Sequence, residues 1–195
     1  MQLSRDALLE AYRSMKTIRE FEERVAKEFA TGDLPGFVHL YAGEEASAVG
    51  VCSHLVESDQ IISTHRGHGH CIAKGCEVEP MMLELFGREG GLCGGKGGSM
   101  HVADLSKGMM GANAIVGGGP PLACGAAMTA KIKKTGGVAV SFTGDGGSNQ
   151  GTTLESMNLA SVMQLPVVFV FENNGFAEST AANWSVAGGS IVRRA

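Results

Sequence analysis

The sequence lacks an excess of positive charge, a long apolar run and a secretory signal, and each absence excludes a class of protein. Its 195 residues include 16 basic and 20 acidic side chains, for a formal net charge of -4. No broad cationic surface therefore favours nucleic acid or an anionic membrane as a partner. No apolar run approaches the roughly 20 residues that cross a bilayer. We expect a soluble, cytoplasmic protein.

Paired cysteines are also lacking, whereas glycine is abundant. The five cysteines are Cys52, Cys71, Cys76, Cys93 and Cys124. Their odd number and the lack of a Cys-x-x-Cys pair predict reduced, mostly buried thiols rather than disulfides or structural zinc. The 29 glycines are concentrated between Gly87 and Gly151. This density predicts loops and close backbone approaches, which commonly hold ligands.

The hydrophobic pattern predicts a single domain over residues 1–195 in which helices and strands alternate. Ser4 can cap a helix that ends near Gly32, and further helices are expected over 44–55, 80–86, 122–134 and 154–163. Buried strands are expected over 61–64, 138–142 and 166–171, and a loop over 65–70. The order strand, helix, strand favours an α/β fold, an open and mostly parallel sheet with helices on both faces. Residues 190–195 resemble the start of another helix, so we expect a C-terminal part to be missing.

Polar residues follow the last two predicted strands. Asp145 offers a carboxylate, Asn174 an amide oxygen, and a main-chain carbonyl near Phe176 a third oxygen. Parallel strands joined by one helix end at the same sheet edge, where ligands of such folds bind. Hard oxygen atoms suit Mg²⁺, and glycines beside a helix start suit phosphates. Each half alone is also an ordinary turn sequence, but together they predict a magnesium and phosphate site.

The run from Gly144 to Asn174 resembles the cofactor signature of thiamine-diphosphate enzymes, which begins with Gly-Asp-Gly and ends with Asn-Asn. Nearly the whole chain resembles the alpha subunit of the first component of 2-oxo acid dehydrogenase complexes, through residues 37–46, 65–69, 94–101 and 113–117. Within that family, residues 64–74 and 91–93 look most like acetoin dehydrogenase. The resemblance implies a thiamine-diphosphate-binding fold.

The resemblance also implies which residues hold the metal and the diphosphate. Asp145 and Asn174 should bind Mg²⁺ through their side chains. Phe176, where relatives commonly have tyrosine, should bind it through the main-chain carbonyl. The residues expected around the diphosphate are Gly144, Gly146 and Gly147.

Four more residues are expected near the cofactor. His65 and Arg66 match a pair that approaches it in the family, and the donor fork of Arg66 suits a diphosphate. Ala114 and Val116 match positions that flank the aminopyrimidine. Relatives often have glycine at the Ala114 position.

His39 and His68 match histidines near the reacting carbon and are the candidates for proton transfer to the substrate oxygen. The resemblance implies cleavage of acetoin and transfer of a two-carbon unit to lipoamide, or the corresponding reaction of pyruvate or a branched-chain 2-oxo acid. In the family, the activating glutamate belongs to a beta subunit. We therefore expect a heterotetramer of two alpha and two beta chains that serves a lipoyl-bearing acyltransferase.

Three other hypotheses remain open at this point. A transition-metal site could be built from His65, His68, His70, Cys71 and Cys76, although Arg66 in their midst disfavours a cation. A nucleotide-binding module could use the Gly144 loop, but that loop lacks the Gly-Lys-Ser/Thr of a phosphate loop. A non-catalytic interaction subunit is the third.

Overall fold

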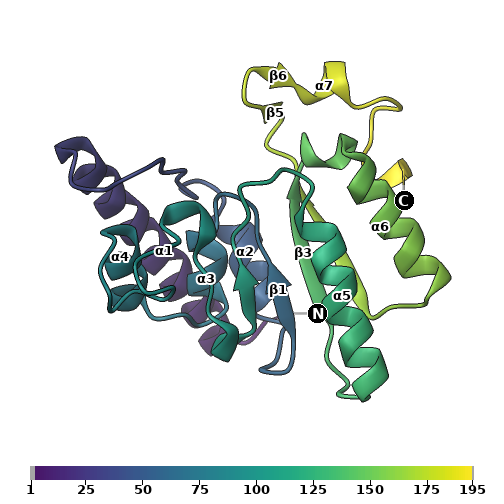
Figure 1. The fold of residues 1–195 in the computed structure, drawn as a ribbon, viewed down its shortest axis with the longest axis horizontal. Helices are drawn as coiled ribbons and strands as arrows, with labels where there is room; N and C mark the ends of the chain where they lie inside the picture. The colour runs from purple at the N-terminus through teal and green to yellow at the C-terminus, as the bar shows by residue number, and fades with distance from the viewer. Residues whose placement is uncertain (1–2, 195) are drawn as a thin grey trace. The chain divides into compact units, whose positions relative to one another are not determined.

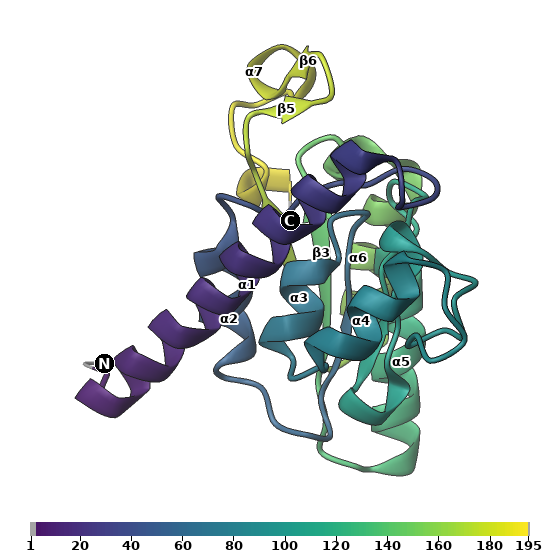
Figure 2. The ribbon, with the colours of Figure 1, turned by 90° about the vertical axis from the view of Figure 1, so that its left-hand side faces the viewer.

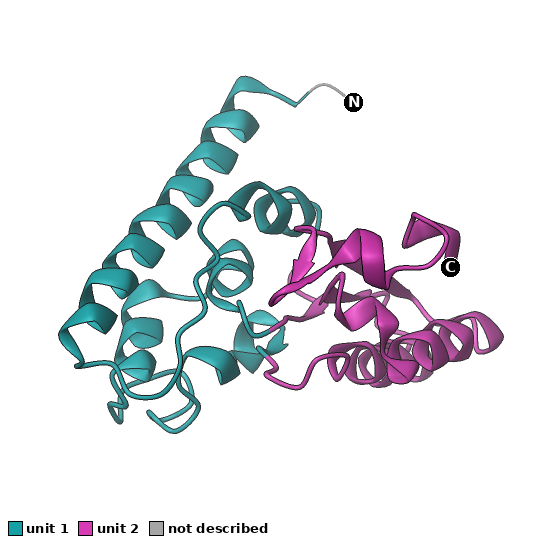
Figure 3. Cartoon of the chain, turned by 90° about the horizontal axis from the view of Figure 1, so that it is seen from above, with its two compact units in different colours: residues 1–55, 65–112 teal, residues 56–64, 113–195 magenta. Residues whose placement is uncertain are grey.

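The structure, a computed structural model, describes residues 3–194 and contains two compact units (Figure 3). Unit 1 comprises Met1–Leu55 and His65–Ala112, and unit 2 comprises Val56–Thr64 and Asn113–Ala195. All five cysteines are free, and all but the half-buried Cys93 are buried, which confirms the prediction for the thiols. No helix within residues 3–194 is long and apolar enough to span a membrane. That the chain is one domain stays a prediction.

Helix α1 (Arg5–Thr31) opens unit 1 and follows the sequence prediction at both ends (Figure 2). The Ser4 hydroxyl accepts a hydrogen bond from the amide of Ala7 at 3.2 Å, which satisfies one amide of the first turn. At the other end Gly32 adopts the left-handed conformation with φ 84° and its amide donates to the carbonyl of Phe29.

Three helices form the core of unit 1. Helices α2 (Glu45–Cys52) and α3 (His68–Ala73) both contact α1. Their shared apolar cluster consists of Ile18, Tyr41, Ala48 and Val49. The rest of the unit contains α4 (Val78–Leu85), the 3₁₀ turns η1 (Ser99–His101) and η2 (Leu105–Lys107), and the short strand β2 (Met109–Gly111).

The loop prediction for residues 65–70 was wrong in its second half, because α3 begins at His68. Alternating histidine and glycine residues have low helix propensity, so the sequence pattern did not predict this helix. The side chains of His68 and His70 are fully buried, and each has a hydrogen-bond partner within unit 1. Tertiary contacts therefore override the low helix propensity of the run.

Unit 2 is an α/β unit around three parallel strands (Figure 1). Strand β3 (Ala139–Gly144) lies between β1 (Gln60–Ile62) and β4 (Val167–Glu172). Helices α5 (Gly119–Lys133) and α6 (Gly151–Val162) pack on one another, and the turn η3 (Gly147–Asn149) precedes α6. This arrangement confirms the predicted α/β class with a parallel sheet. The chain continues into the hairpin β5 (Phe176–Ala177) and β6 (Thr180–Ala181), then α7 (Ala182–Ser185) and η4 (Val192–Arg194).

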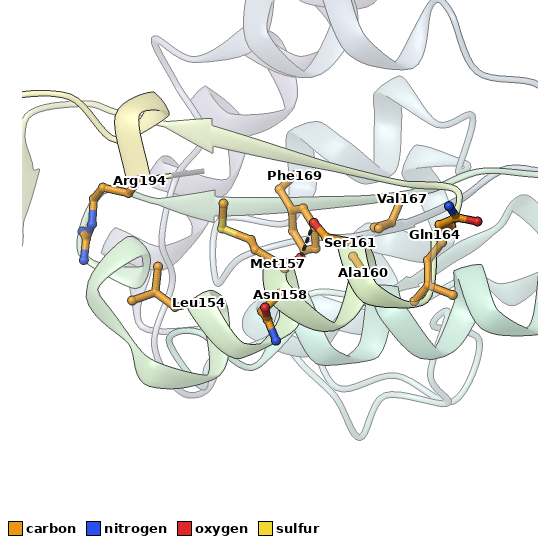
Figure 4. A pocket seen from close by; sticks show the side chains of 10 residues that line it. Leu154, Met157, Asn158, Ala160, Ser161, Gln164, Val167, Phe169 and Arg194 are labelled. Atoms are coloured by element: carbon orange, nitrogen blue, oxygen red, sulfur yellow. Dashed lines mark hydrogen bonds between the residues drawn. The ribbon is translucent and has the colours of Figure 1, made fainter.

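Strand β4 is half-buried rather than buried, which corrects the sequence prediction for this strand. Val168 is 49 % exposed, and within unit 2 only β3 pairs with β4. A cavity of about 610 Å³ lies along this strand and is lined by α6, the turn after it, β4 and Arg194. Figure 4 shows the side chains that line it. None of the site residues predicted from the sequence lines this cavity.

Substitution of two helical glycines by alanine should change the stability of the protein in opposite directions. A Cβ on Gly69 in α3 would lie 2.0 Å from Cδ1 of Tyr41, whereas a Cβ on Gly50 in α2 meets nothing within 4 Å. Gly69→Ala should destabilise the protein by about 1–3 kcal/mol through overpacking. Gly50→Ala, the matched control, should stabilise it by up to about 1 kcal/mol through helix propensity. Urea unfolding measures both values, and equal effects of the two substitutions would contradict the packing of α3 on Tyr41.

Candidate functional site

The ends of β3 and β4 bring two predicted parts of the site to the same edge of the sheet. The strands run in register from Ala139 opposite Val167 to Gly144 opposite Glu172. Asp145 therefore follows β3 at the level where Asn173 follows β4. The predicted meeting of these two polar segments is confirmed.

Asp145 is buried without a complete set of partners. The residue is 2 % exposed. Its main-chain carbonyl accepts two hydrogen bonds from Ser148, one from the hydroxyl at 2.6 Å and one from the main-chain amide at 3.3 Å. Its carboxylate atom Oδ2 has no hydrogen-bond partner within residues 3–194. The buried hydroxyl of Thr143, two residues earlier, also has no hydrogen-bond partner within residues 3–194. A buried anionic oxygen is costly unless a cation or donor offsets it, so this position suits a metal ion.

The two asparagines each form a local turn. Oδ1 of Asn173 accepts from the amide of Gly175, and Oδ1 of Asn174 accepts from the amide of Phe176, both at 3.1 Å. Gly175 has φ +91°, a conformation that few other residues adopt readily. These turns lead directly into the hairpin β5–β6, where the side chain of Phe176 is 58 % exposed. The exposed phenyl ring fits a role for Phe176 that uses its main chain alone.

The glycines of the β3–η3 turn are packed tightly on one side and open on another. A Cβ on Gly146 would lie 2.5 Å from Cβ of Ala177, and one on Gly147 would lie 2.7 Å from Cγ2 of Thr143. At Gly144, however, a Cβ would meet nothing within 4 Å. The turn thus combines fixed main-chain geometry with space for a ligand. Helix α6 starts just beyond it without a side-chain cap, so its first amides are suited to an anion.

The loop of residues 113–118 lies against this turn. The hydroxyl of Thr152, in the first turn of α6, donates to the carbonyl of Gly117 at 2.8 Å. Cγ1 of Val116 would lie 3.6 Å from a Cβ on Gly147, and Val116 is 52 % exposed. Ala114 is half-buried in the same loop. Unit 2 therefore brings Val116 together with the glycine turn.

Unit 1 brings His39, His65 and Arg66 together. The rings of the two histidines meet edge to face, with centroids 4.8 Å apart and an interplanar angle of 88°. Nη1 of Arg66 donates to the carbonyl of Leu40 at 2.6 Å. Nδ1 of His39 is buried with no hydrogen-bond partner within residues 3–194. The cluster therefore has a buried imidazole nitrogen available to a ligand.

Both histidines of this cluster favour the neutral form. Burial, followed by the charges of His39 and Arg66, lowers the pKa of His65 to about 4. Burial, followed by Arg66 and His68, lowers the pKa of His39 as well. Near neutral pH His65 is therefore an uncharged group that can accept or donate a hydrogen bond.

His68 is placed differently from the other predicted site residues. Its side chain is fully buried, Nδ1 lies 3.1 Å from both carboxylate oxygens of Glu22, and Nε2 lies 2.9 Å from the hydroxyl of Ser99. Its direct part in proton transfer stays a prediction. Sequence reasoning missed Glu22 and Ser99, although an acidic residue on the apolar stripe between Ile18 and Val25 was a signal for Glu22.

The structure does not support the hypothesis of a histidine-based transition-metal site. Residues 3–194 contain no group of three or more His, Cys, Asp or Glu side chains that could hold a metal ion. His68 is engaged by Glu22, and Nε2 of His70 lies 3.2 Å from the hydroxyl of Tyr41. The predicted metal ligands Asp145 and Asn174 would offer oxygen donors instead, and their part in metal binding stays a prediction.

The depressed pKa of His65 predicts how protonation of this ring affects stability. Its pKa in the folded protein, about 4, lies below the ordinary value of 6.5, so the unfolded chain binds more protons between these values. The contribution of His65 to stability is complete above pH 6.5 and is lost as the pH falls through about 4. NMR titration of the histidine rings should find His65 neutral at pH 5.5, and Arg66→Gln should raise its pKa. A midpoint near 6.5 in the unchanged protein would contradict the burial of this ring.

Comparison of the sequence with known proteins shows the family of the chain. The sequence model of the family described as dehydrogenase E1 component matches residues 13–195. Over all 195 residues the chain is 61 % identical to the alpha subunits of acetoin:2,6-dichlorophenolindophenol oxidoreductase from Cupriavidus necator and Bacillus subtilis, covering 59 % of each. It is 44 % identical over 178 residues to the pyruvate dehydrogenase E1 component subunit alpha of Zymomonas mobilis, covering 91 % of this chain and 50 % of that protein.

The chain therefore spans about 59 % of the length of the two acetoin relatives. The family match extends over nearly the whole chain, including the glycine turn, both asparagines and the His39, His65 and Arg66 cluster. The chain belongs to the dehydrogenase E1 component family.

Proposed function

We propose that this chain is the thiamine-diphosphate-binding alpha subunit of an acetoin-cleaving dehydrogenase. The observation that carries the proposal is the buried Oδ2 of Asp145, which has no hydrogen-bond partner within residues 3–194 and lies at the aligned ends of β3 and β4. A resident cation at this point would offset the cost of the buried carboxylate. The names of the relatives add the substrate class, because two relatives that are 61 % identical are named for acetoin.

The metal in this proposal is Mg²⁺, held by oxygen atoms alone. Asp145 supplies a carboxylate oxygen, Asn174 its amide oxygen and Phe176 its main-chain carbonyl. Oδ1 of Asn174 also accepts a hydrogen bond from the amide of Phe176, which fixes the position of this oxygen at the end of β4. Mg²⁺ prefers such hard oxygen ligands and completes its octahedron with phosphate oxygens and water.

The diphosphate is proposed to lie over the glycine turn. The main chain at Gly144, Gly146 and Gly147 would approach it, and the uncapped start of α6 would contribute its positive end. The open space at Gly144 supports this placement. Val116 and Ala114 would flank the aminopyrimidine, since their loop is tied to α6 through Thr152.

The residues proposed from unit 1 provide donors and neutral bases. Arg66 would offer its guanidinium to the diphosphate. His65 and His39, both with lowered pKa values, would exchange hydrogen bonds or protons with the cofactor and the substrate oxygen. The sequence also predicted proton transfer by His68. Because its side chain is buried, we propose that His68 supports the site residues instead of contacting the substrate.

When bound, thiamine diphosphate supplies a nucleophilic carbon and an electron sink for cleavage beside a carbonyl. In our proposal acetoin is cleaved and acetaldehyde is released. The remaining two-carbon unit is oxidised to the acetyl level as it is transferred to lipoamide on an acyltransferase, and the lipoamide disulfide is reduced. The chain works in a heterotetramer whose beta subunit provides the activating acid. The five free thiols support a reducing compartment, which in our proposal is the cytoplasm. Pyruvate is the second candidate substrate, because the relative from Zymomonas mobilis is named for it.

The adjacent asparagines provide a matched test of the metal site. Asn173 and Asn174 make equivalent turns, each with a hydrogen bond of 3.1 Å, but only Asn174 is a proposed ligand. Asn174→Ala should weaken Mg²⁺-dependent binding of thiamine diphosphate by about 10- to 100-fold, and Asn173→Ala by much less. Calorimetry of the protein assembled with its beta subunit, with Mg²⁺ or with a chelator, measures this. Equal losses for the two variants would count against Asn174 as a ligand.

Asp145→Asn separates metal binding from folding. The substitution should abolish the effect of Mg²⁺ on cofactor binding, while leaving the metal-free protein as stable or more stable because a buried unpaired charge is removed. Thermal unfolding with and without Mg²⁺ reports both effects. If Asp145→Asn retained the same gain in stability from Mg²⁺ and cofactor, the proposed metal site would be wrong.

Substrate identity is tested by dye reduction. The chain co-expressed with its beta subunit should reduce 2,6-dichlorophenolindophenol faster with acetoin than with pyruvate or branched-chain 2-oxo acids. Because electrons released from the substrate reach the dye only through the cofactor, omission of thiamine diphosphate should abolish reduction with every substrate. Stronger reduction with pyruvate would reject acetoin and leave the cofactor proposal standing.

A further inference from the structure

A chain of three hydrogen-bonded side chains is buried in unit 1. Glu22 on α1 contacts Nδ1 of His68 with both carboxylate oxygens at 3.1 Å, and Nε2 of His68 lies 2.9 Å from the hydroxyl of Ser99. Glu22 and His68 are fully buried and Ser99 is 5 % exposed. The order carboxylate, imidazole, hydroxyl is that of a hydrolase triad. No substrate carbonyl can reach a hydroxyl buried to this degree, so an acyl-transfer role is excluded.

The carboxylate decides how the imidazole is protonated. An ionised carboxylate only accepts hydrogen bonds, so the proton of His68 belongs on Nδ1 and faces Glu22. In the neutral ring Nε2 then accepts the hydrogen bond from Ser99. The three groups therefore hold the ring in one tautomer and one orientation, which a purely apolar contact would not do.

The segment that leads to Ser99 is held by a second buried carboxylate, that of Glu84. The residues before Ser99 wrap around Glu84, whose Oε2 accepts hydrogen bonds from the amides of Cys93 at 2.7 Å and Gly95 at 2.8 Å. Oε1 accepts from Gly97 at 2.6 Å and Gly98 at 3.1 Å. Burial raises the pKa of Glu84, but these four amides together outweigh it and hold the pKa below its ordinary value. Glu84 thus fixes the glycine-rich segment that ends at Ser99.

The middle residue of this hydrogen-bonded network, His68, closely follows the residues proposed for the cofactor in the sequence. His68 is the first residue of α3, and Arg66 precedes it by two positions. Gly67 between them packs closely against Ala112, since a Cβ on Gly67 would lie 2.5 Å from the Cβ of Ala112. Arg66 is also tied to the carbonyl of Leu40. The orientation of His68 therefore constrains the main chain from which Arg66 and His65 extend.

We propose that Glu22, His68 and Ser99 are positioning residues that set Arg66 and His65 for the diphosphate cofactor. This inference rests on the proposed function. A buried charged network contributes little stability compared with apolar residues of similar volume, and its directional bonds fit a role in orientation. The same network accounts for the burial of His68, two residues after Arg66.

The experiment measures binding of thiamine diphosphate with Mg²⁺ by the full-length protein assembled with its beta subunit. Glu22→Gln and Ser99→Ala break the chain at its two ends, and Glu23→Gln changes an exposed acidic neighbour on the same helix. We expect Glu22→Gln and Ser99→Ala to raise the Kd of the cofactor by about 10-fold or more, as loss of supporting residues does elsewhere. Glu23→Gln should leave the Kd unchanged.

A double-mutant cycle separates positioning from general destabilisation. If Ser99 acts through Arg66, Ser99→Ala should weaken binding in the wild-type background and add nothing in the Arg66→Ala background. The proposal would be overturned if Ser99→Ala raised the Kd by the same factor in both backgrounds. It would also be overturned if the variant lowered the melting temperature but left the Kd unchanged. If Glu22→Gln fails to fold, Ser99→Ala decides, because it removes a single oxygen atom. Failure of the wild-type assembly to bind thiamine diphosphate would reject the proposed function, whereas normal binding by the variants would reject only this inference.

Discussion

The parallel pairing of β3 with β4 is the constraint on which the site in unit 2 depends. Because the register holds up to Gly144 opposite Glu172, the chain leaves the two strands at one level and presents a carboxylate beside two amides. A shift of one residue would turn Asp145 to the other side of its strand end. The hairpin that follows β4 then limits the turn, since Ala177 occupies the space beside Gly146. Backbone geometry, more than side-chain packing, places the oxygen atoms.

Asp145 differs from other buried carboxylates of the chain, including Asp59 of unit 2, both of whose oxygens accept a main-chain hydrogen bond at 2.8 Å. In unit 1, Glu22 and Glu84 are buried but amply hydrogen-bonded, by one imidazole and by four amides respectively. In unit 2, Asp145 is just as buried, yet Oδ2 has no partner within residues 3–194. Proteins rarely leave such an atom unsatisfied without a ligand or functional reason. The contrast within one chain is what distinguishes a carboxylate that braces the structure from one that suits a metal ion.

Much of this organisation was predictable from the sequence. The cap at Ser4, the end near Gly32 and the strand–helix–strand order are local signals, and the structure confirms them. The start of α3 was not predictable, because burial of two histidines depends on partners 46 and 29 residues away along the chain. The exposure of β4 is likewise a tertiary property, since a strand with one neighbour has the same apolar sequence as a central one. Glu84 gave no local signal, because its partners are main-chain amides.

The glycine-rich segment around Glu84 has a consequence for how such motifs are interpreted. Its amides converge on one point, as they do in loops that bind phosphate, but here a carboxylate of the same chain already fills that point. A tethered anion has an effective concentration in the millimolar range or above, so a free phosphate would compete poorly for these amides. Two glycine clusters of similar composition are therefore distinguished by occupancy: one is closed by an internal anion, and the other, at Gly144, remains open to an external one.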